Sequence, residues 1–181
     1  AMTPFEPSLT QASKQLISEA EDAQTKADIA AWLAEQIAAQ PGTLVLLGPG
    51  STVQAVAEHL GVSKTLLGID ALLGGESVGQ DLCETGLLEL LHRHDRAVMI
   101  LSPIGAQGFV LGRGNLQISP AVVRRIGRDG LRVVATQAKL RRTPCLRFDT
   151  GDAALDRALC ARGYVPVITG YRRQRMTPVC R

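Results

Sequence analysis

Short aliphatic runs alternate with helical segments along most of this chain, and this alternation limits the fold more than any other feature. Strands that alternate with short helices form parallel βαβ units. We therefore predict an α/β fold, with a mostly parallel sheet of βαβ units and helices on both faces. The predicted strands are residues 43–47, 65–70, 97–101, 131–136, 145–148 and 165–169. The predicted helices are residues 52–60, 81–92, 120–126, 137–142 and 152–162.

The chain before the first strand predicts a helical arm. Residues 8–40 are typical of helix, which we expect in two pieces, and Ile29, Leu33 and Ile37 form an apolar stripe on the second. That stripe fits either the core of the domain or a contact between two copies of the chain. We predict an N-terminal helical arm or linker over residues 1–40 and one α/β domain over residues 41–181.

Composition excludes several classes of protein. Apolar residues make up 45% of the 181 residues, enough for a core, while aromatic residues make up only 3%. No stretch approaches the roughly 20 apolar residues that span a bilayer. Residues 1–7 lack the basic and apolar regions of a signal peptide. We expect a cytoplasmic protein that does not contact membranes.

The four cysteines are widely spaced and include no CxxC pair. A structural zinc site requires paired spacing with further ligands nearby, and His92 and His94 have no such pattern around them. We expect no metal site. Cysteines in a reducing cytosol remain thiols, so we predict that all four are free.

A first glycine loop follows the first predicted strand, with the sequence GPGST at residues 48–52. A strand, a tight turn and a helix N-terminus together present backbone N–H groups and a favourable dipole to an anion. No GK[ST] follows, so this is not a Walker loop, and it is not a GxGxxG fingerprint. The alternative is a glycine turn in which Ser51 or Thr52 caps the helix. The candidate phosphate-binding residues are Gly48, Gly50, Ser51 and Thr52.

A second glycine-rich segment covers residues 102–119. Glycine allows positive φ and close approach of the backbone to a ligand, and Arg113 between two glycines suits a bidentate phosphate contact. Amide side chains nearby could read a base or a ribose. The alternative is a hairpin whose bulges need glycine. The candidate residues are Gly105, Gln107, Gly108, Gly112, Arg113, Gly114 and Asn115.

Carboxylates give weaker signals. Asp70 ends the second predicted strand, where a carboxylate could hold a ribose hydroxyl, bind Mg²⁺, act as a base, or cap a turn. Asp152 is placed to cap the following helix. Tyr171, beside Arg172, is placed either to stack on a base or to lie in a surface tail. We find no nucleophile paired with a base in the sequence.

Charge is unevenly distributed. Residues 119–181 contain fourteen Lys and Arg against four Asp and Glu, whereas the rest of the chain is acidic. A basic surface attracts phosphates, nucleic acid or an acidic partner. Nucleic-acid binding is disfavoured, because the basic third lacks interleaved aromatic residues and any known reading motif.

Several segments together resemble one family. GPGSTVQAVAEHLGVSKTLLGIDAL, SPIGAQGFVLGRGNLQISPAVVRRIG, VVAT, DTGD and ITGY occur in this order between residues 48 and 171. This series is similar to the C-terminal region of the ATP-NAD kinase-like proteins, in the branch with the AcoX-like proteins of acetoin catabolism. The most specific part is the stretch from IGAQGF to QISP.

The resemblance implies transfer of a phosphoryl group from a nucleotide to the 2′-hydroxyl of NAD. It implies ATP or NAD(P) as ligands, and Mg²⁺ in the full-length protein. The family's GGDGT motif, in a preceding N-terminal domain, is absent from this sequence. The resemblance therefore makes this chain the C-terminal part of a longer protein, inactive alone and partnered by the missing kinase domain, with homo-oligomers also open.

Two alternatives remain. A strand, a GxGST loop and a strand ending in Asp also resemble ribose-phosphate isomerases and related sugar-phosphate sensors. Isomerisation needs a carboxylate and usually a lysine, and Lys64 and Lys139 are the lysines available for that role. The chain also fits a non-enzymatic ligand-sensing domain.

Overall fold

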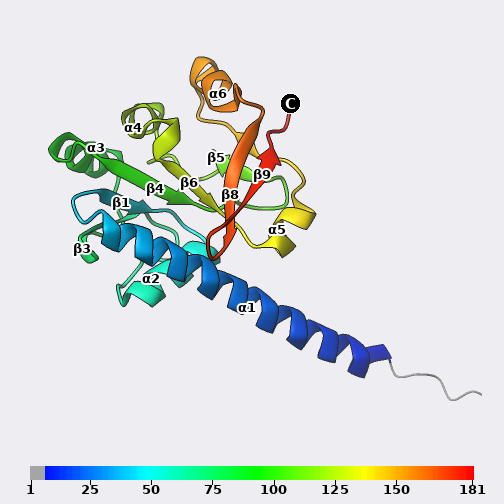
Figure 1. The fold of residues 1–181 in the computed structure, drawn as a ribbon. Helices are drawn as coiled ribbons and strands as arrows, with labels where there is room; N and C mark the ends of the chain where they lie inside the picture. Colours follow the sequence, from blue (N-terminus) through cyan, green and yellow to red (C-terminus); the bar gives the residue numbers. More distant parts are fainter. Residues whose placement is uncertain (1–6) are drawn as a thin grey trace, which may run out of the picture.

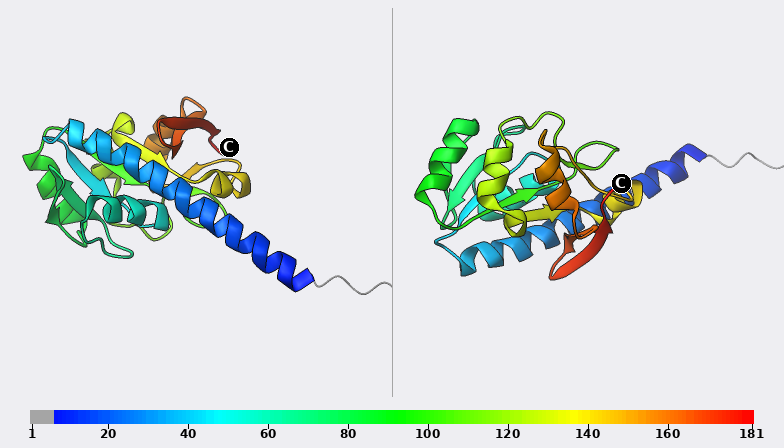
Figure 2. Two further views of the ribbon diagram at one scale, coloured as in Figure 1. Left: turned by 60° about the horizontal axis from the view of Figure 1, so that its bottom comes forward. Right: turned by 90° about the horizontal axis from the view of Figure 1, so that it is seen from above.

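The computed structural model describes residues 7–181, and the predictions for residues 1–6 lie outside that range. Helix α1 (Pro7–Ala39) is one continuous helix of 33 residues, so the expected break in the arm is wrong. Ile29, Leu33 and Ile37 are buried against helix α2 (Ser51–Leu60) and the sheet, which makes the apolar stripe part of the core. Figures 1 and 2 show the first half of α1 extending beyond the rest of the domain.

The central sheet has seven strands in the order β3-β2-β1-β4-β6-β8-β9. Its four central strands β1, β4, β6 and β8 are parallel, as predicted. At the edges β2 pairs antiparallel with β1, β3 pairs antiparallel with β2, and β9 pairs antiparallel with β8. The bounds are β1 Leu44–Leu47, β2 Asp70–Leu73, β3 Glu76–Gly79, β4 Ala97–Leu101, β6 Leu131–Val134, β8 Tyr164–Gly170 and β9 Arg173–Pro178.

Helices cover both faces of this sheet, as predicted, and each face has its own core. Helices α1 and α2 pack on one face (Figure 1). The other face carries α3 (Glu84–Arg93), α4 (Pro120–Ile126) and α6 (Ala153–Cys160), with α5 (Gln137–Arg142) and a 3-10 turn (Arg128–Gly130) beside them. Strand β1 contributes Leu44 and Leu46 to one core and Val45 and Leu47 to the other. Burial on both faces explains its continuous aliphatic sequence.

Two predicted segments begin later than expected, for backbone reasons. Strand β2 starts at Asp70, because residues 63–69 form a loop that returns the chain to the end of β1 and makes β2 antiparallel. Helix α3 starts at Glu84 instead of residue 81, because Asp81 has a φ of 48° and cannot belong to a right-handed helix. Among the helices of residues 7–181, none combines the length and apolar character needed to cross a membrane.

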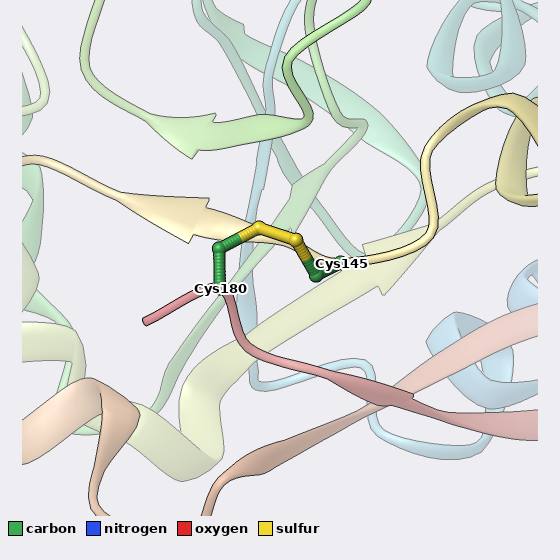
Figure 3. Close-up of a disulfide and its surroundings, with 2 residues drawn as sticks. All are labelled: Cys145 and Cys180. Carbon is green, nitrogen blue, oxygen red and sulfur yellow. A yellow bond between two sulfur atoms is a disulfide. The ribbon is translucent and has the colours of Figure 1, made fainter.

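A small second sheet pairs β5 (Phe109–Leu111) in parallel with β7 (Arg147–Phe148). The prediction of four free thiols is wrong, because Cys145, just before β7, forms a disulfide with Cys180 (Figure 3). A pairing across 35 positions leaves no signature in local sequence spacing. Cys83 and Cys160 are free.

Candidate functional site

The carboxyl ends of the parallel strands bring four loops to one edge of the sheet. Leu47 of β1 lies opposite Ile100, Leu101 of β4 opposite Val133, and Val134 of β6 opposite Ile168. The chain that leaves each strand therefore starts from the same edge. In open α/β sheets this is where ligands bind. The loops begin at Gly48, Ser102, Ala135 and Tyr171.

The first glycine loop (residues 48–51) contacts the start of the glycine-rich segment (residues 102–119). The N–H of Gly48 donates to the carbonyl of Ile100 at 2.9 Å. A Cβ on Gly50 would lie 3.2 Å from Cβ of Ser102, and Gly50 has a φ of 121°. Only glycine adopts that conformation without strain, so the close approach of the two loops depends on Gly50.

Helix α2 begins without a side-chain cap. Its N-cap residue is Gly50, so the expected alternative of Ser51 or Thr52 as N-cap is wrong. In contrast, Ser119, Thr136 and Asp152 cap α4, α5 and α6 through their side chains, and Asp152 does so as predicted. The first-turn N–H groups of an uncapped helix have no internal partner. They can donate to an anion, with the helix dipole favouring negative charge.

Lys139 joins the glycine-rich segment to α5. Its Nζ atom donates to the carbonyl of Gly105 at 2.8 Å, although the two residues are 34 positions apart. Burial lowers the pKa of Lys139, and the nearby charge of Arg142 lowers it further. Sequence reasoning considered Lys139 only as an isomerase lysine and did not place it beside this loop, because a contact of this range has no local signal.

Gly108 and Gly112 hold the small sheet together. A Cβ on Gly108 would lie 2.7 Å from the carbonyl oxygen of Cys145, and one on Gly112 would lie 2.6 Å from that of Asp149. Both glycines also have positive φ. Packing therefore explains why both positions are glycine. The hairpin alternative is correct in part, because Ile104 and Phe109 form an antiparallel bridge.

Arg113 and Asn115 form the more polar end of the segment. Arg113 is exposed, has a φ of 52°, and places its guanidinium 4.8 Å from the centre of the Phe109 ring. Asn115 is 7% exposed, and within residues 7–181 its Nδ2 atom has no hydrogen-bond partner. A buried amide nitrogen without a partner is costly, so this donor stands out in the segment. Gln107, Gly105 and Gly114 are exposed.

Asp70 lies at this same edge, opposite Leu47 at the end of β1, and is 1% exposed. Its carboxylate accepts hydrogen bonds from Lys64 Nζ at 3.2 Å, from the N–H and hydroxyl of Thr65 at 2.9 Å, and from the N–H of Asp81 at 2.9 Å. Burial lowers the pKa of Lys64, and Asp70 partly opposes that effect. These contacts give Asp70 and Lys64 a structural role in holding the loop of residues 63–69.

Tyr171 packs on α1 in place of a surface tail. Its ring meets Trp32 edge-on at 5.7 Å, and its hydroxyl donates to Glu35 at 2.7 Å. The hydrogen bond to Glu35 raises the pKa of Tyr171. Arg172, also beside Trp32, completes the turn between β8 and β9. Across residues 7–181 no three His, Cys, Asp or Glu side chains gather in a group that could hold a metal ion.

A family model described as the ATP-NAD kinase C-terminal domain matches residues 42–179. The chain belongs to this family. The matched region contains both glycine segments and every strand, and helix α1 precedes it. Searches of curated proteins and of solved structures found no match. The candidate site of this ATP-NAD kinase C-terminal domain, at the edge formed by β1, β4 and β6, lies within the matched region.

Proposed function

We propose that this domain holds the phosphate groups of a nucleotide, ATP or NAD(P), as the C-terminal half of an ATP-NAD kinase-like enzyme. One observation carries the proposal: the uncapped N-terminus of α2 lies beside Ser102, where the two glycine segments touch. Free N–H groups, a helix dipole and exposed glycine backbone suit a phosphate ester. Membership in the family supports a nucleotide over other phosphate compounds.

The residues take distinct roles in this proposal. Gly50, Ser51 and Thr52 cradle a phosphate through backbone N–H groups and the exposed Ser51 hydroxyl, while Gly48, whose N–H donates to Ile100, fixes the loop. Arg113 and Lys139, both in contact with the glycine-rich segment, neutralise the charge of the ligand. The unpaired amide of Asn115, with Gln107, binds a ribose or a base. Gly105 and Gly114 let the backbone approach the ligand, while Gly108 and Gly112 shape the segment, and Asp70 holds the loop of residues 63–69.

Phosphoryl transfer depends on positioning and charge neutralisation more than on covalent catalysis. The half-enzyme proposed here needs no nucleophile of its own, and the GGDGT-bearing half would contribute the catalytic Asp. The proposal assigns no residue of this domain to Mg²⁺, which would belong to the full-length protein. We expect no NADP formation by the domain alone and activity when the missing half is added.

The sugar-phosphate isomerase alternative is less well supported. Isomerisation needs a free carboxylate and a lysine, whereas Lys64 and Asp70 form a buried ion pair with each other. The nucleic-acid alternative is weakened because guanidinium groups of the basic third are engaged within the domain. Arg124 pairs with Asp152, and Arg125 donates to the carbonyls of Leu91 and His94.

Thermal unfolding with NAD, NADP, ATP and several sugar phosphates tests the proposal. A ligand at about 100 times its dissociation constant adds about 2.7 kcal/mol of stability, which raises the midpoint by several degrees. We expect shifts with the nucleotides, and a shift with sugar phosphates alone would favour the alternative. A Gly50→Val plus Arg113→Ala variant should lose the shift.

The matched control is Gly61→Val plus Arg141→Ala. Gly61 also has a positive φ and flanks α2, but at its other end, and Arg141 is an exposed arginine of α5. The control therefore repeats a valine substitution at positive φ and the loss of one charge away from the site. Wild-type nucleotide affinity in both double variants would contradict the assignment of these loops to the ligand site.

A further inference from the structure

The disulfide between Cys145 and Cys180 fixes the C-terminus of the chain beside the glycine-rich segment (Figure 3). The main chain repeats this link on both sides of Leu146. Its N–H donates to the carbonyl of Pro178 at 2.9 Å, and its carbonyl accepts from the N–H of Cys180 at 2.8 Å. The end of β9 and the start of β7 are thus joined by one covalent bond and two hydrogen bonds.

The same stretch of β7 contacts Gly108. The N–H of Arg147 donates to the carbonyl of Gly108 at 2.8 Å. A Cβ on Gly108 would lie 2.7 Å from the carbonyl oxygen of Cys145 and would also overlap Cγ2 of Thr143. Backbone packing this close transmits a displacement of Cys145 directly to Gly108, because no flexible side chain lies between them.

The sheet formed by β5 and β7 is small. It has two strands, and β7 has only two residues. A two-stranded sheet is marginal in water unless its surroundings support it. Here the core supports Leu111 and Leu146 from one side, and the link to Cys180 supports residue 145. Arg113 and Asn115 follow β5 directly, so their placement depends on the same sheet.

We propose that the Cys145–Cys180 disulfide is a redox switch that sets the order of the glycine-rich segment. A dithiol reductant attacks the disulfide through a mixed disulfide and leaves as a cyclic or intramolecular disulfide. Two electrons and two protons pass to the domain, giving two thiols. The two main-chain hydrogen bonds of Leu146 then hold residues 178–180 to β7 without the covalent link, and residues 105–114 become less ordered. The consequence for nucleotide affinity rests on the function proposed above.

A reductant can reach this disulfide. Both cysteines are half-buried, and Cys180 lines an open cavity of about 500 Å³ with Gly163, Pro178 and Arg181. Cys160 lines the same cavity. Burial and the charge of Asp156 raise the pKa of Cys160, which keeps it a thiol at neutral pH and a poor attacking group. Cys160 is therefore not the group that we expect to open the disulfide.

Hydrogen exchange of the oxidised and the dithiothreitol-reduced chain tests the switch without any ligand. We expect residues 105–114 to exchange about tenfold faster after reduction, while β1 and α2 keep their rates. Mass spectrometry must first show two thiols in the oxidised chain and four in the reduced chain. Equal exchange in both forms, faster exchange throughout the domain, or four thiols before reduction would each overturn the proposal.

Two variants complete the test. Cys145→Ser plus Cys180→Ser should reproduce the reduced chain under oxidising conditions, and Cys83→Ser plus Cys160→Ser should behave as the oxidised wild type. Titration of NAD and ATP then separates the two proposals. Faster exchange with lower affinity supports both. Faster exchange with unchanged affinity supports the switch and contradicts the ligand-binding role of the segment.

Discussion

The Nζ atom of Lys64 lies 3.2 Å from Oδ2 of Asp70, and neither side chain is more than 2% exposed. Lys64 also donates to the carbonyls of Thr65 and Gly68, so all three of its protons have acceptors. This pair closes the loop of residues 63–69, next to the end of β1. A buried ion pair is costly to break by removal of one partner, since the other charge stays buried.

Replacement of Asp70 by Asn should therefore destabilise the domain by about 3 kcal/mol, because Lys64 loses its counter-charge. The free energy of unfolding in urea measures the effect. Asp95→Asn, at an exposed position, is the control and should change stability by less than about 0.5 kcal/mol. A loss below about 1 kcal/mol for Asp70→Asn would show that the pair contributes little.

Alanine at Gly108 should cost about 3 kcal/mol of stability. The new Cβ meets the carbonyl oxygen of Cys145, and φ is +73°. Gly105→Ala is the matched control, because φ is +67° there but nothing lies within 4 Å of the added Cβ. It should cost about 1 kcal/mol, the backbone strain alone. Equal losses in urea unfolding would mean that the contact at Gly108 carries no weight.

Much of this fold follows from local sequence. The Ser119-Pro120 pair predicts the start of α4, and the structure places the N-cap at Ser119. Strand β4 spans the predicted residues, Ala97–Leu101, because an aliphatic run of this length that is followed closely by Pro103 favours a strand over a helix. Local capping and periodicity therefore suffice where one element's own residues decide its structure.

Features that depend on distant partners were not predictable in the same way. The direction of β2 depends on a loop clamped by Asp70, and the sequence pattern of a strand is the same in either direction. The disulfide and the contact of Lys139 with Gly105 join residues 35 and 34 positions apart. The sequence predicts Gly108 and Gly112 as ligand-binding residues. Their contacts with distant parts of the chain show that packing already requires glycine at both positions.

Methionine at Lys139 should weaken nucleotide binding about tenfold, the effect of losing one charge-assisted contact. Calorimetric titration with ATP and NAD measures it, and Arg141→Met, an exposed cation on the same helix, should leave affinity nearly unchanged. Burial lowers the pKa of Lys139 below the ordinary lysine value of 10.5. As pH rises, wild-type affinity should therefore fall before that value is reached, because Lys139 loses its charge earlier. Identical affinity and pH dependence in Lys139→Met would exclude a binding role.

Alanine at Leu33 should destabilise the domain by about 3 kcal/mol, since this side chain is 2% exposed in the core beneath α1. Leu16, on the extended half of the same helix, is 67% exposed, and its replacement should change stability by less than about 0.5 kcal/mol. Urea unfolding at two protein concentrations gives both values. A loss of stability in Leu33→Ala that depends on protein concentration would indicate that the apolar stripe forms an interface between two copies of the chain.

Acid stability should depend on the cap of α6. The backbone N–H of Leu155 and the guanidinium of Arg124 lower the pKa of Asp152 below its ordinary value of 3.8. A lowered carboxyl pKa stabilises the folded state fully above the unfolded-state value, and this stabilisation is lost as pH falls through the folded-state value. Asp152→Asn keeps an uncharged cap at every pH. Unfolding free energies measured from pH 6 down to about pH 3 should therefore fall less steeply in the variant. Parallel curves would mean that the Asp152 carboxylate is not linked to folding.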